Sequence, residues 1–335
     1  MRRAPLLLAA ALLALLAVPA RAGANSCTDS TGPQRYATAS YGGYVAFPSK
    51  TPTSLVVFFH GYGHDAADWA ENHLERVAEE NDAVTVAMDY PGQSETATWQ
   101  VREGAEASVA AARALKLRCK PDQTVAYGVS MGANASGIAL ASANGLFDWW
   151  VAVEGAHNLI ETYHEASLVA ASGNAFANEA KGGIEHDMGG TYQEAPGTYE
   201  ASTNVLLAEQ IRASGIDGVV MVHGVGDGLV PYNQSREMAL VLAGMPIDFT
   251  TVLTRGADRR PETDGTTPDG YAYDAAGVEA LELSRFAGHA NENSQVHLVG
   301  KLGFERLRDL LAGRIDFVVN EHVVDGAATD GQRVP

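Results

Sequence analysis

The sequence predicts an α/β fold in which helices cover both faces of an open, mostly parallel β-sheet. Continuous apolar runs, of which residues 54–60 (SLVVFFH) are the clearest, are typical of strands buried on both faces of a parallel sheet. Stretches with the helical spacing of apolar residues separate these runs. Because strands and helices alternate along the chain, we expect a three-layer α/β sandwich.

The expected elements follow in chain order. Residues 36–47 alternate in hydropathy and carry aromatic side chains, so they predict one or two antiparallel edge strands. Buried strands are expected at residues 54–60, 83–88, 124–129, 149–153, 218–223 and 247–254, with a short strand at 281–286. Helices are expected at residues 67–80, 96–117, 131–143, 231–242 and 295–311.

Two long segments interrupt the alternation. Residues 157–215 exceed what one crossover helix requires, and they combine many acidic residues with a glycine-rich middle. Residues 256–280 are polar and rich in turn-forming residues. Such excursions commonly shape a binding site. We therefore expect a lid or cap at about 157–215, inserted in one domain at 23–335, with surface decoration as the alternative.

The composition excludes several classes of protein. Hydrophobic residues make up 46% of the chain and charged residues 19%, which excludes wholesale disorder. With 23 Lys and Arg against 41 Asp and Glu, the formal net charge is −18. A negative field of this size repels phosphates, so we expect neither nucleic acid nor an anionic membrane surface as a partner. The oligomeric state is not indicated.

Residues 1–22 are typical of a secretory signal peptide. Arg2 and Arg3 precede an apolar run at residues 6–18, and the Ala-Arg-Ala at residues 20–22 suits a signal peptidase. A membrane anchor is the alternative, but this run is shorter than the roughly 20 residues that a spanning helix needs. We expect cleavage and an extracellular or periplasmic location. Cleavage removes three arginines, so the mature charge is 20 − 41 = −21.

Export permits a disulfide, for which Cys27 and Cys119 are the two cysteines of the chain. A bridge between them would tie the mature N-terminus to a position deep in the fold. Two free thiols are the alternative.

The sequence Gly128-Val129-Ser130-Met131-Gly132 lies between an expected strand and an expected helix. A serine there lies on a sharp turn, where flanking glycines allow strained dihedral angles and close backbone approach. Its hydroxyl then lies at the carboxyl edge of the sheet, where open α/β sheets bind ligands. The pattern predicts that Ser130 is a nucleophile.

His60-Gly61-Tyr62-Gly63 follows an earlier buried strand and ends at the same edge. A tight glycine turn there directs a backbone N–H inward, and the Tyr62 N–H is the best candidate. The Met131 N–H at the start of the next helix would be its partner in an oxyanion hole. His60 itself is compatible with simple packing beneath the loop.

A nucleophilic serine needs a base and an orienting carboxylate. Asp227 lies in a glycine-rich turn just after the strand at 218–223, which is the expected place for the acid. Glu154 ends the strand at 149–153 and is a rival for that role. His289, which follows Asp227 in the chain, is the expected base, whereas His297 falls inside the apolar pattern of a helix.

These features together resemble the α/β-hydrolase superfamily. They are HGYG at 60–63, GVSMG at 128–132, HGVGDGLVP at 223–231 and GH at 288–289, in the family's order of nucleophile, acid and histidine. The resemblance implies an eight-stranded type of sheet, a triad of the serine, aspartate and histidine named above, and a cap over the catalytic domain. Within the superfamily, the chain is most similar to secreted esterases and to dienelactone-hydrolase or prolyl-oligopeptidase-like catalytic domains.

The expected activity is hydrolysis of carboxylic esters through an acyl-enzyme, with a small-molecule or polymeric ester as substrate. The alternatives are a peptidase or amidase of the prolyl-oligopeptidase type, a hydrolase of aromatic or polymeric esters, and a non-catalytic binding protein. The tryptophans either line an aromatic ester site or pack in the core; they are Trp69, Trp99, Trp149 and Trp150.

We expect neither a metal nor an organic cofactor. His60 and His64 lie four residues apart in a loop that contains glycines, so they do not share a helix face. The acidic group at residues 185–187 is more typical of a solvated loop than of a cation site. Residues 224–228 lack the spacing of a dinucleotide-binding fingerprint.

Overall fold

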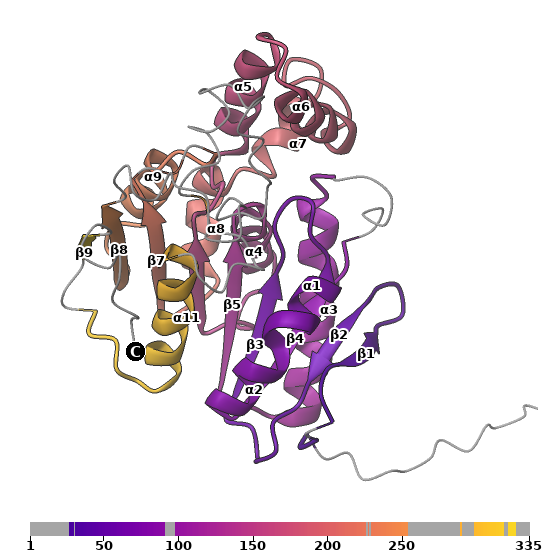
Figure 1. The fold of residues 1–335 in the computed structure, drawn as a ribbon, viewed down its shortest axis with the longest axis vertical. Coiled ribbons are helices and arrows are strands. Elements are labelled where there is room, and N and C mark those ends of the chain that lie inside the picture. The colour runs from indigo at the N-terminus through magenta and orange to yellow at the C-terminus, as the bar shows by residue number, and fades with distance from the viewer. Residues whose placement is uncertain are drawn as a thin grey trace, which may run out of the picture.

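A computed structural model of the chain describes residues 27–29, 31–90, 98–225, 227, 229–253, 289, 298–317 and 321–325 (Figure 1). Four expectations lie outside these residues: the signal peptide at 1–22, the loop at 256–280, the strand at 281–286 and the histidine at 297.

One sheet of nine strands organises the described residues and confirms the expected α/β sandwich. Its strands are β1 (Gln34–Ala37), β2 (Gly42–Ala46), β3 (Ser54–Phe59), β4 (Ala83–Met88), β5 (Gln123–Val129), β6 (Trp149–Val153), β7 (Gly218–Gly224), β8 (Ile247–Leu253) and β9 (Glu321–Asp325). Their order is β1-β2-β4-β3-β5-β6-β7-β8-β9. β2 pairs antiparallel with β1 and β4, and the other pairs are parallel. The carboxyl ends of the parallel strands therefore share one edge.

Helices form a layer on each face of this sheet. One layer contains the helical segment α1 (Ala66–Trp69), η1 (Ala70–Leu74) and α2 (Glu75–Asn81), together with α11 (Leu298–Leu311). The other contains α3 (Val101–Cys119), α4 (Met131–Ser142), α8 (Ala208–Ala213) and α9 (Asn233–Val241). None of the described helices combines the length and the hydropathy needed to cross a membrane.

Strand β3 shows why both faces are covered. All six of its residues are buried. Leu55 and Val57 belong to the core beneath α3 and α4, whereas Val56 and Phe58 belong to the core beneath α1 and α11. Successive side chains of a strand point to opposite faces. A strand that is apolar throughout therefore needs a layer on each side, as its sequence predicts.

The segment at 157–215, which we expect to be a lid, contains α5 (Leu159–Ala170), α6 (Ala175–Met188), α7 (Pro196–Glu200), η2 (Asn204–Leu207) and α8. Figure 1 shows α5, α6 and α7 standing above the carboxyl edge of the sheet, whereas η2 and α8 pack against α4. The Tyr163 hydroxyl on α5 donates a hydrogen bond to Glu185 on α6 (2.7 Å), and Lys181 binds the same carboxylate (2.6 Å). The first bond ties α5 to α6, and the second lies within α6 and holds the Glu185 carboxylate.

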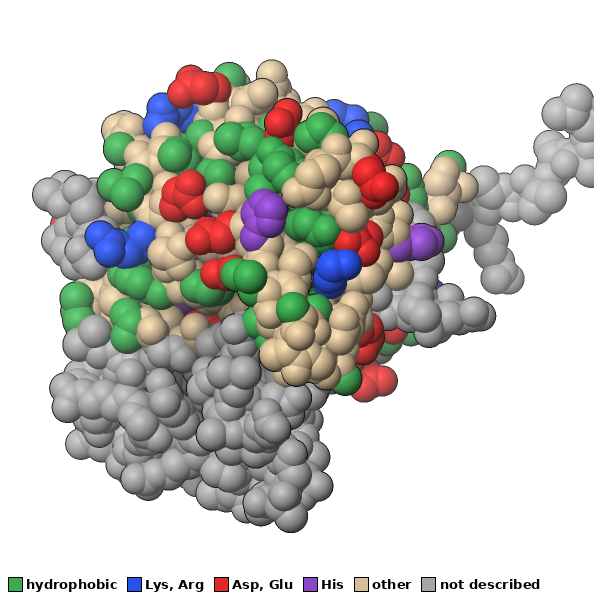
Figure 2. All heavy atoms as spheres, turned by 90° about the horizontal axis from the view of Figure 1, so that it is seen from above, with side chains coloured by type: hydrophobic (Ala, Val, Ile, Leu, Met, Phe, Trp, Pro, Cys, Tyr) green, Lys and Arg blue, Asp and Glu red, His purple; other side chains and the backbone are tan. Residues whose placement is uncertain are grey.

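The acidic side chains of this segment are not gathered in one patch. On the face seen from above, Figure 2 shows acidic groups scattered among hydrophobic ones. Glu194 accepts hydrogen bonds from the Thr191 N–H (2.9 Å) and hydroxyl (2.8 Å), and Glu185 binds Lys181. At least part of the segment's acidity is thus used in local hydrogen bonds.

The structure differs from the expected elements at two places. The helix expected at 96–117 begins only at Val101, because the Trp99 N–H donates a hydrogen bond to Asp187 of α6 rather than entering a helix. Strand β9 was not expected. It is a short strand at the edge of the sheet that pairs with β8 alone, so its sequence carries little of the buried-strand signal.

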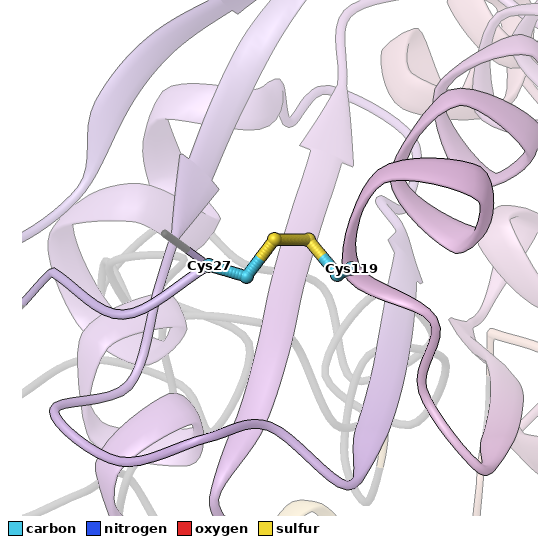
Figure 3. Close-up of a disulfide and its surroundings, with 2 residues drawn as sticks. All are labelled: Cys27 and Cys119. Carbon is cyan, nitrogen blue, oxygen red and sulfur yellow. A yellow bond between two sulfur atoms is a disulfide. The ribbon is translucent and has the colours of Figure 1, made fainter. Parts of the chain in front are cut away.

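Cys27 and Cys119 form a disulfide, as expected (Figure 3). Their Cα atoms are 5.6 Å apart, and 92 positions separate them in the sequence. Cys119 is the last residue of α3, so the bridge fixes the first described residues against the end of that helix. Closing so long a loop restricts the unfolded chain, which contributes about 4–5 kcal/mol to stability in the chain-entropy model.

We expect reduction of the purified protein to lower its melting temperature by several degrees, because the unfolded chain regains this freedom. Thermal melts with and without a reductant test this. The double variant Cys27→Ser/Cys119→Ser is the control, since its melt should not respond to the reductant. An unchanged melt of the reduced wild type would contradict a stabilising bridge.

Three buried histidines make stability depend on pH. His60, His73 and His157 are at most 1% exposed. Burial lowers the pKa of each to about 3, and nearby positive charge adds to the effect for His73. In the unfolded chain these pKa values lie near 6.5. Between pH 6.5 and 3 the unfolded state therefore binds more protons, so the free energy of unfolding falls as pH falls.

Each of these histidines should cost about 1.4 kcal/mol of stability for every pH unit below 6.5. Urea unfolding between pH 7 and pH 5 measures this slope. His73→Gln should reduce the slope of the free energy of unfolding against pH by the contribution of about one proton. His186→Gln is the matched control, because the His186 side chain is 77% exposed. Equal slopes for His73→Gln and the wild type would refute the assignment.

Candidate active site

Ser130 lies in a turn that only a few sequences can adopt. It follows β5 directly and precedes α4, with a backbone φ of +55°. A Cβ at position 128 would overlap the backbone of Gly132, and a Cβ at position 132 would overlap the Phe59 carbonyl oxygen. Both glycines are therefore required by close backbone approach. A non-glycine residue at this φ is strained, which is common at functional sites.

The structure brings Ser130, His289 and Asp227 together. The His289 Nε2 is 3.1 Å from the Ser130 Oγ, and its Nδ1 is 2.7 Å from the Asp227 Oδ2. An ionised carboxylate only accepts hydrogen bonds, so Nδ1 carries a proton in this arrangement. In the neutral ring, Nε2 is then the acceptor of a hydrogen bond from the Ser130 hydroxyl. The three residues are between 3% and 8% exposed.

Asp227 is fixed by further donors. The backbone N–H groups of Leu229 and Val230 donate to its Oδ1 at 2.8 and 2.9 Å. Burial by itself disfavours the ionised form, but the charge of His289 and the hydrogen bonds of His223 and His289 outweigh it. Together they lower the pKa of Asp227 to about 2. The carboxylate is thus ionised and held in one orientation at neutral pH.

His223 is a part of this site that the sequence analysis missed. It lies on β7 and is fully buried. Its Nε2 is 2.9 Å from the Val230 carbonyl, which only accepts, and 3.4 Å from the Asp227 Oδ2. Its Nδ1 is 2.7 Å from the Ser235 hydroxyl. The signal in the sequence was a histidine near the end of a buried strand, four residues before the acid.

Glu154 also contacts His289, but less closely. It follows β6 with φ +47° and is fully buried. One carboxylate oxygen is 3.5 Å from the His289 Nδ1, and the other accepts a hydrogen bond of 3.4 Å from the Gly224 N–H. The shorter contact of 2.7 Å and the two backbone donors favour Asp227 as the orienting acid.

The two expected oxyanion donors lie on elements that meet at Ser130. Met131 is the first residue of α4, and the first N–H groups of a helix have no partner inside it. Tyr62 follows β3, and the close approach of Gly132 to Phe59 and His60 brings the start of α4 against that strand end. Tyr62 and Ser130 also line the same cavity. The donor roles of these two N–H groups remain a prediction.

His60 packs beneath this loop, with which its sequence position is compatible. Its ring lies 3.8 Å from that of Tyr90, and its Nδ1 is 3.1 Å from the Gly61 carbonyl oxygen. Full burial lowers its pKa to about 3, so it is neutral at pH 7.

A cavity of about 660 Å³, open mouth included, adjoins Ser130. Its walls come from the Tyr62 loop, from Trp99, from α5 and α6, and from Leu229 and Val230 beside Asp227. Of the four tryptophans considered above, Trp99 lines this cavity. Trp69 and Trp150 are buried in the core, and Trp149 stacks on Phe317.

Glu154, Asp227 and His289 are the described cluster whose spacing permits a metal ion, with ligand atoms within 4.8 Å of one another. However, the His289 Nδ1 and the Asp227 Oδ2 are 2.7 Å apart, a hydrogen-bond distance. Two ligands on a tetrahedral zinc with 2.0 Å bonds lie about 3.3 Å apart. This geometry fits a shared proton better than a shared cation.

The sheet order and the strand–serine–helix turn define an α/β-hydrolase fold. Residues 56–215 match the sequence profile described as the alpha/beta hydrolase family. This match covers a little under half of the chain, and it agrees with the α/β-hydrolase fold that the structure shows. No curated protein matches it in sequence.

Solved structures share this fold at low sequence identity. A carboxyl esterase of the mycorrhizal fungus Tuber melanosporum has a TM-score of 0.54 at 14% identity, over 85% of this chain and 87% of the esterase. A puromycin hydrolase mutant has a TM-score of 0.53 at 13% identity and covers 87% of this chain. A puromycin-hydrolyzing peptidase of Mycobacterium tuberculosis has a TM-score of 0.51 at 16% identity and covers 88%. The present chain spans 40% of the length of each of the last two.

The two carboxylates at His289 can be ranked by substitution. We expect Asp227→Asn to lower kcat for hydrolysis about 10³- to 10⁴-fold, because the charge that orients and stabilises the imidazolium is lost. Glu154→Gln should lower it less than tenfold, since its contact with His289 is longer. Steady-state kinetics with circular dichroism of both variants tests this. The reverse order would move the acid to Glu154.

Proposed function

We propose that this α/β hydrolase is a secreted serine hydrolase that cleaves carboxylic esters. The observation that carries the proposal is the hydrogen-bonded series from Asp227 through His289 to Ser130, which ends at the wall of the cavity. A serine with a positioned base and a fixed acid is the arrangement of acyl transfer.

In the first half of the reaction, the Ser130 Oγ attacks the ester carbonyl carbon while its proton passes to the His289 Nε2. The carbonyl oxygen becomes an oxyanion, to which the Tyr62 and Met131 N–H groups donate hydrogen bonds. The carbon–oxygen bond to the alcohol then breaks, and the alcohol leaves with the proton from His289. Ser130 now carries the acyl group.

In the second half, His289 takes a proton from a water molecule, and the hydroxide formed attacks the acyl carbon. The bond to the Ser130 Oγ breaks, and Ser130 recovers the proton from His289 as the acid leaves. Throughout the cycle the ionised Asp227 stabilises the protonated ring and holds its orientation.

The cavity favours an ester over a peptide. Its walls beside Ser130 are mostly apolar side chains of α5 and α6. A peptide brings N–H groups that lose their hydrogen bonds to water when they enter such a site, whereas an ester carries no donor at its reacting group. The fungal carboxyl esterase, matched over most of its length, is in keeping with this choice. An amidase is the second candidate, because the same triad serves both reactions.

Export and the lid are parts of the same proposal. The disulfide Cys27–Cys119 is of a kind that persists in oxidising compartments, in agreement with the signal peptide expected at 1–22. The helices α5 and α6 supply one wall of the cavity and act as the lid. We further propose that the enzyme works without a cofactor and takes neutral esters, without nucleic acid or a membrane anchor as partner.

Ser130→Ala should lower the hydrolysis of p-nitrophenyl acetate and butyrate at least about 10³-fold, because no other group can take the acyl chain. Ser142→Ala at the far end of the same helix is the matched control and should retain wild-type rates. A parallel assay with peptide p-nitroanilides measures amidase activity, which is the alternative function. Turnover that persists in Ser130→Ala would refute the nucleophile, and faster cleavage of the anilides would make the protein an amidase.

A further inference from the structure

We infer that the cavity beside Ser130 is a subsite for a flat, uncharged aromatic ring carried by the ester substrate. The inference rests on the proposed ester hydrolysis and specifies which esters the site selects. It follows from the rings in the cavity wall, from the small residues between them and from the contacts that hold the rings in place.

Three aromatic rings from separate parts of the chain meet at the cavity. Tyr62 belongs to the loop after β3, Trp99 to the segment before α3, and Phe176 to the first turn of α6. The Tyr62 ring centroid is 5.7 Å from that of Trp99 and 5.9 Å from that of Phe176, the latter at an interplanar angle of 85°. These spacings are typical of attractive aromatic pairs. A substrate ring placed among them would contact the faces of some of these rings and the edges of others.

The rest of the wall leaves room for such a ring. The helices α5 and α6 contribute mostly small side chains there, namely Ala166, Val169, Ala177 and Ala180. Leu229 and Val230 close the side next to Asp227. The empty space here is about 660 Å³ when the open mouth is included. Ser130 lies in the same wall, so a ring held here is attached close to the reacting carbonyl.

The aromatic wall is held in place by contacts outside the cavity. The Trp99 N–H donates a hydrogen bond to Asp187, whose side chain is 3% exposed. Asp187 lies on α6, the helix that also carries Phe176. The hydrogen bond from the Tyr163 hydroxyl to Glu185 ties the same helix to α5. Because these side chains are already ordered, less binding free energy is lost in ordering them when a ligand binds.

The polar side chains in the cavity wall do not favour a charged substrate ring. Thr162, Glu165 and Asn174 are its polar members besides Ser130 and Tyr62. The Asn174 side-chain oxygen accepts the Ala177 N–H at 2.8 Å and caps α6. Glu165 brings negative charge, which disfavours a carboxylate on the ring. Because the wall is otherwise mostly apolar, burying a cation there is also costly, and the wall suits an uncharged ring.

The test compares rings of equal size that differ in aromaticity. Ethyl phenylacetate against ethyl cyclohexylacetate probes a ring in the acid part of the ester. Benzyl acetate against cyclohexylmethyl acetate probes a ring in the alcohol part. The cyclohexyl ring is the more hydrophobic member, so simple burial of apolar area favours it. We expect kcat/KM of the wild type to favour the phenyl member of one pair by about 2- to 12-fold, from the usual strength of aromatic pairing.

Substitution of one ring tests whether this preference arises in the cavity. Phe176→Leu should lower the phenyl-to-cyclohexyl ratio of kcat/KM, because one of the three rings is removed while Tyr62 and Trp99 remain. Because the ratio is taken on one preparation, it does not depend on the fraction of active protein. Phe317→Leu removes a ring that stacks on Trp149, away from this cavity, and should keep the wild-type ratio.

The outcomes separate the two proposals. Hydrolysis of these esters with no phenyl preference in either pair would overturn the aromatic subsite and leave the ester hydrolase standing. A phenyl-to-cyclohexyl ratio that is unchanged in Phe176→Leu would also overturn the subsite. If the wild type hydrolyses none of these esters or p-nitrophenyl acetate, the proposed ester hydrolysis itself fails.

Discussion

The arrangement of the site depends on how closely α4 approaches the end of β3. Position 132 has no room for a side chain, because a Cβ there would overlap the Phe59 carbonyl oxygen. This approach fixes three things at once. It forces the turn at Ser130 into a positive φ, it places the first N–H groups of α4 beside the loop after β3, and it leaves the serine hydroxyl at the sheet edge. A larger residue at position 132 would disturb all of them together.

Around that turn, one histidine lies in a buried and strongly polarised environment. His289 lies between Ser130 on one side and two buried carboxylates on the other. The carboxylates are not equivalent. Asp227 accepts hydrogen bonds from two backbone N–H groups at 2.8 and 2.9 Å and lies beside His223, whereas the Gly224 N–H reaches Glu154 at the longer distance of 3.4 Å. Where water is excluded, such fixed charges act more strongly than they do in solution. The difference in hydrogen bonding thus distinguishes two acids of similar position.

The sheet and Ser130 were predictable because their signals are local. Parallel strands buried on both faces have continuous apolar runs in their sequences. Their carboxyl ends share one edge of the sheet, so the positions of Ser130 and Asp227 follow from the strand ends alone. His223 was missed because its contact with Asp227 depends on how a loop folds back over β7. Phe176 was missed for a similar reason, since it reaches the cavity only through the packing of α6 above the sheet. The late start of α3 depends on Asp187, which lies far away in the sequence.

The disulfide lies at the opposite end of α3 from the aromatic wall. Cys119 ends this helix and Val101, next to Trp99, begins it. With 19 residues the helix is about 28 Å long. A tether attached ahead of Cys27 would therefore anchor the molecule at the end of α3 remote from the aromatic wall. On a solid support or in a fusion protein, this geometry keeps the aromatic wall away from the point of attachment, and the disulfide holds that point against the fold.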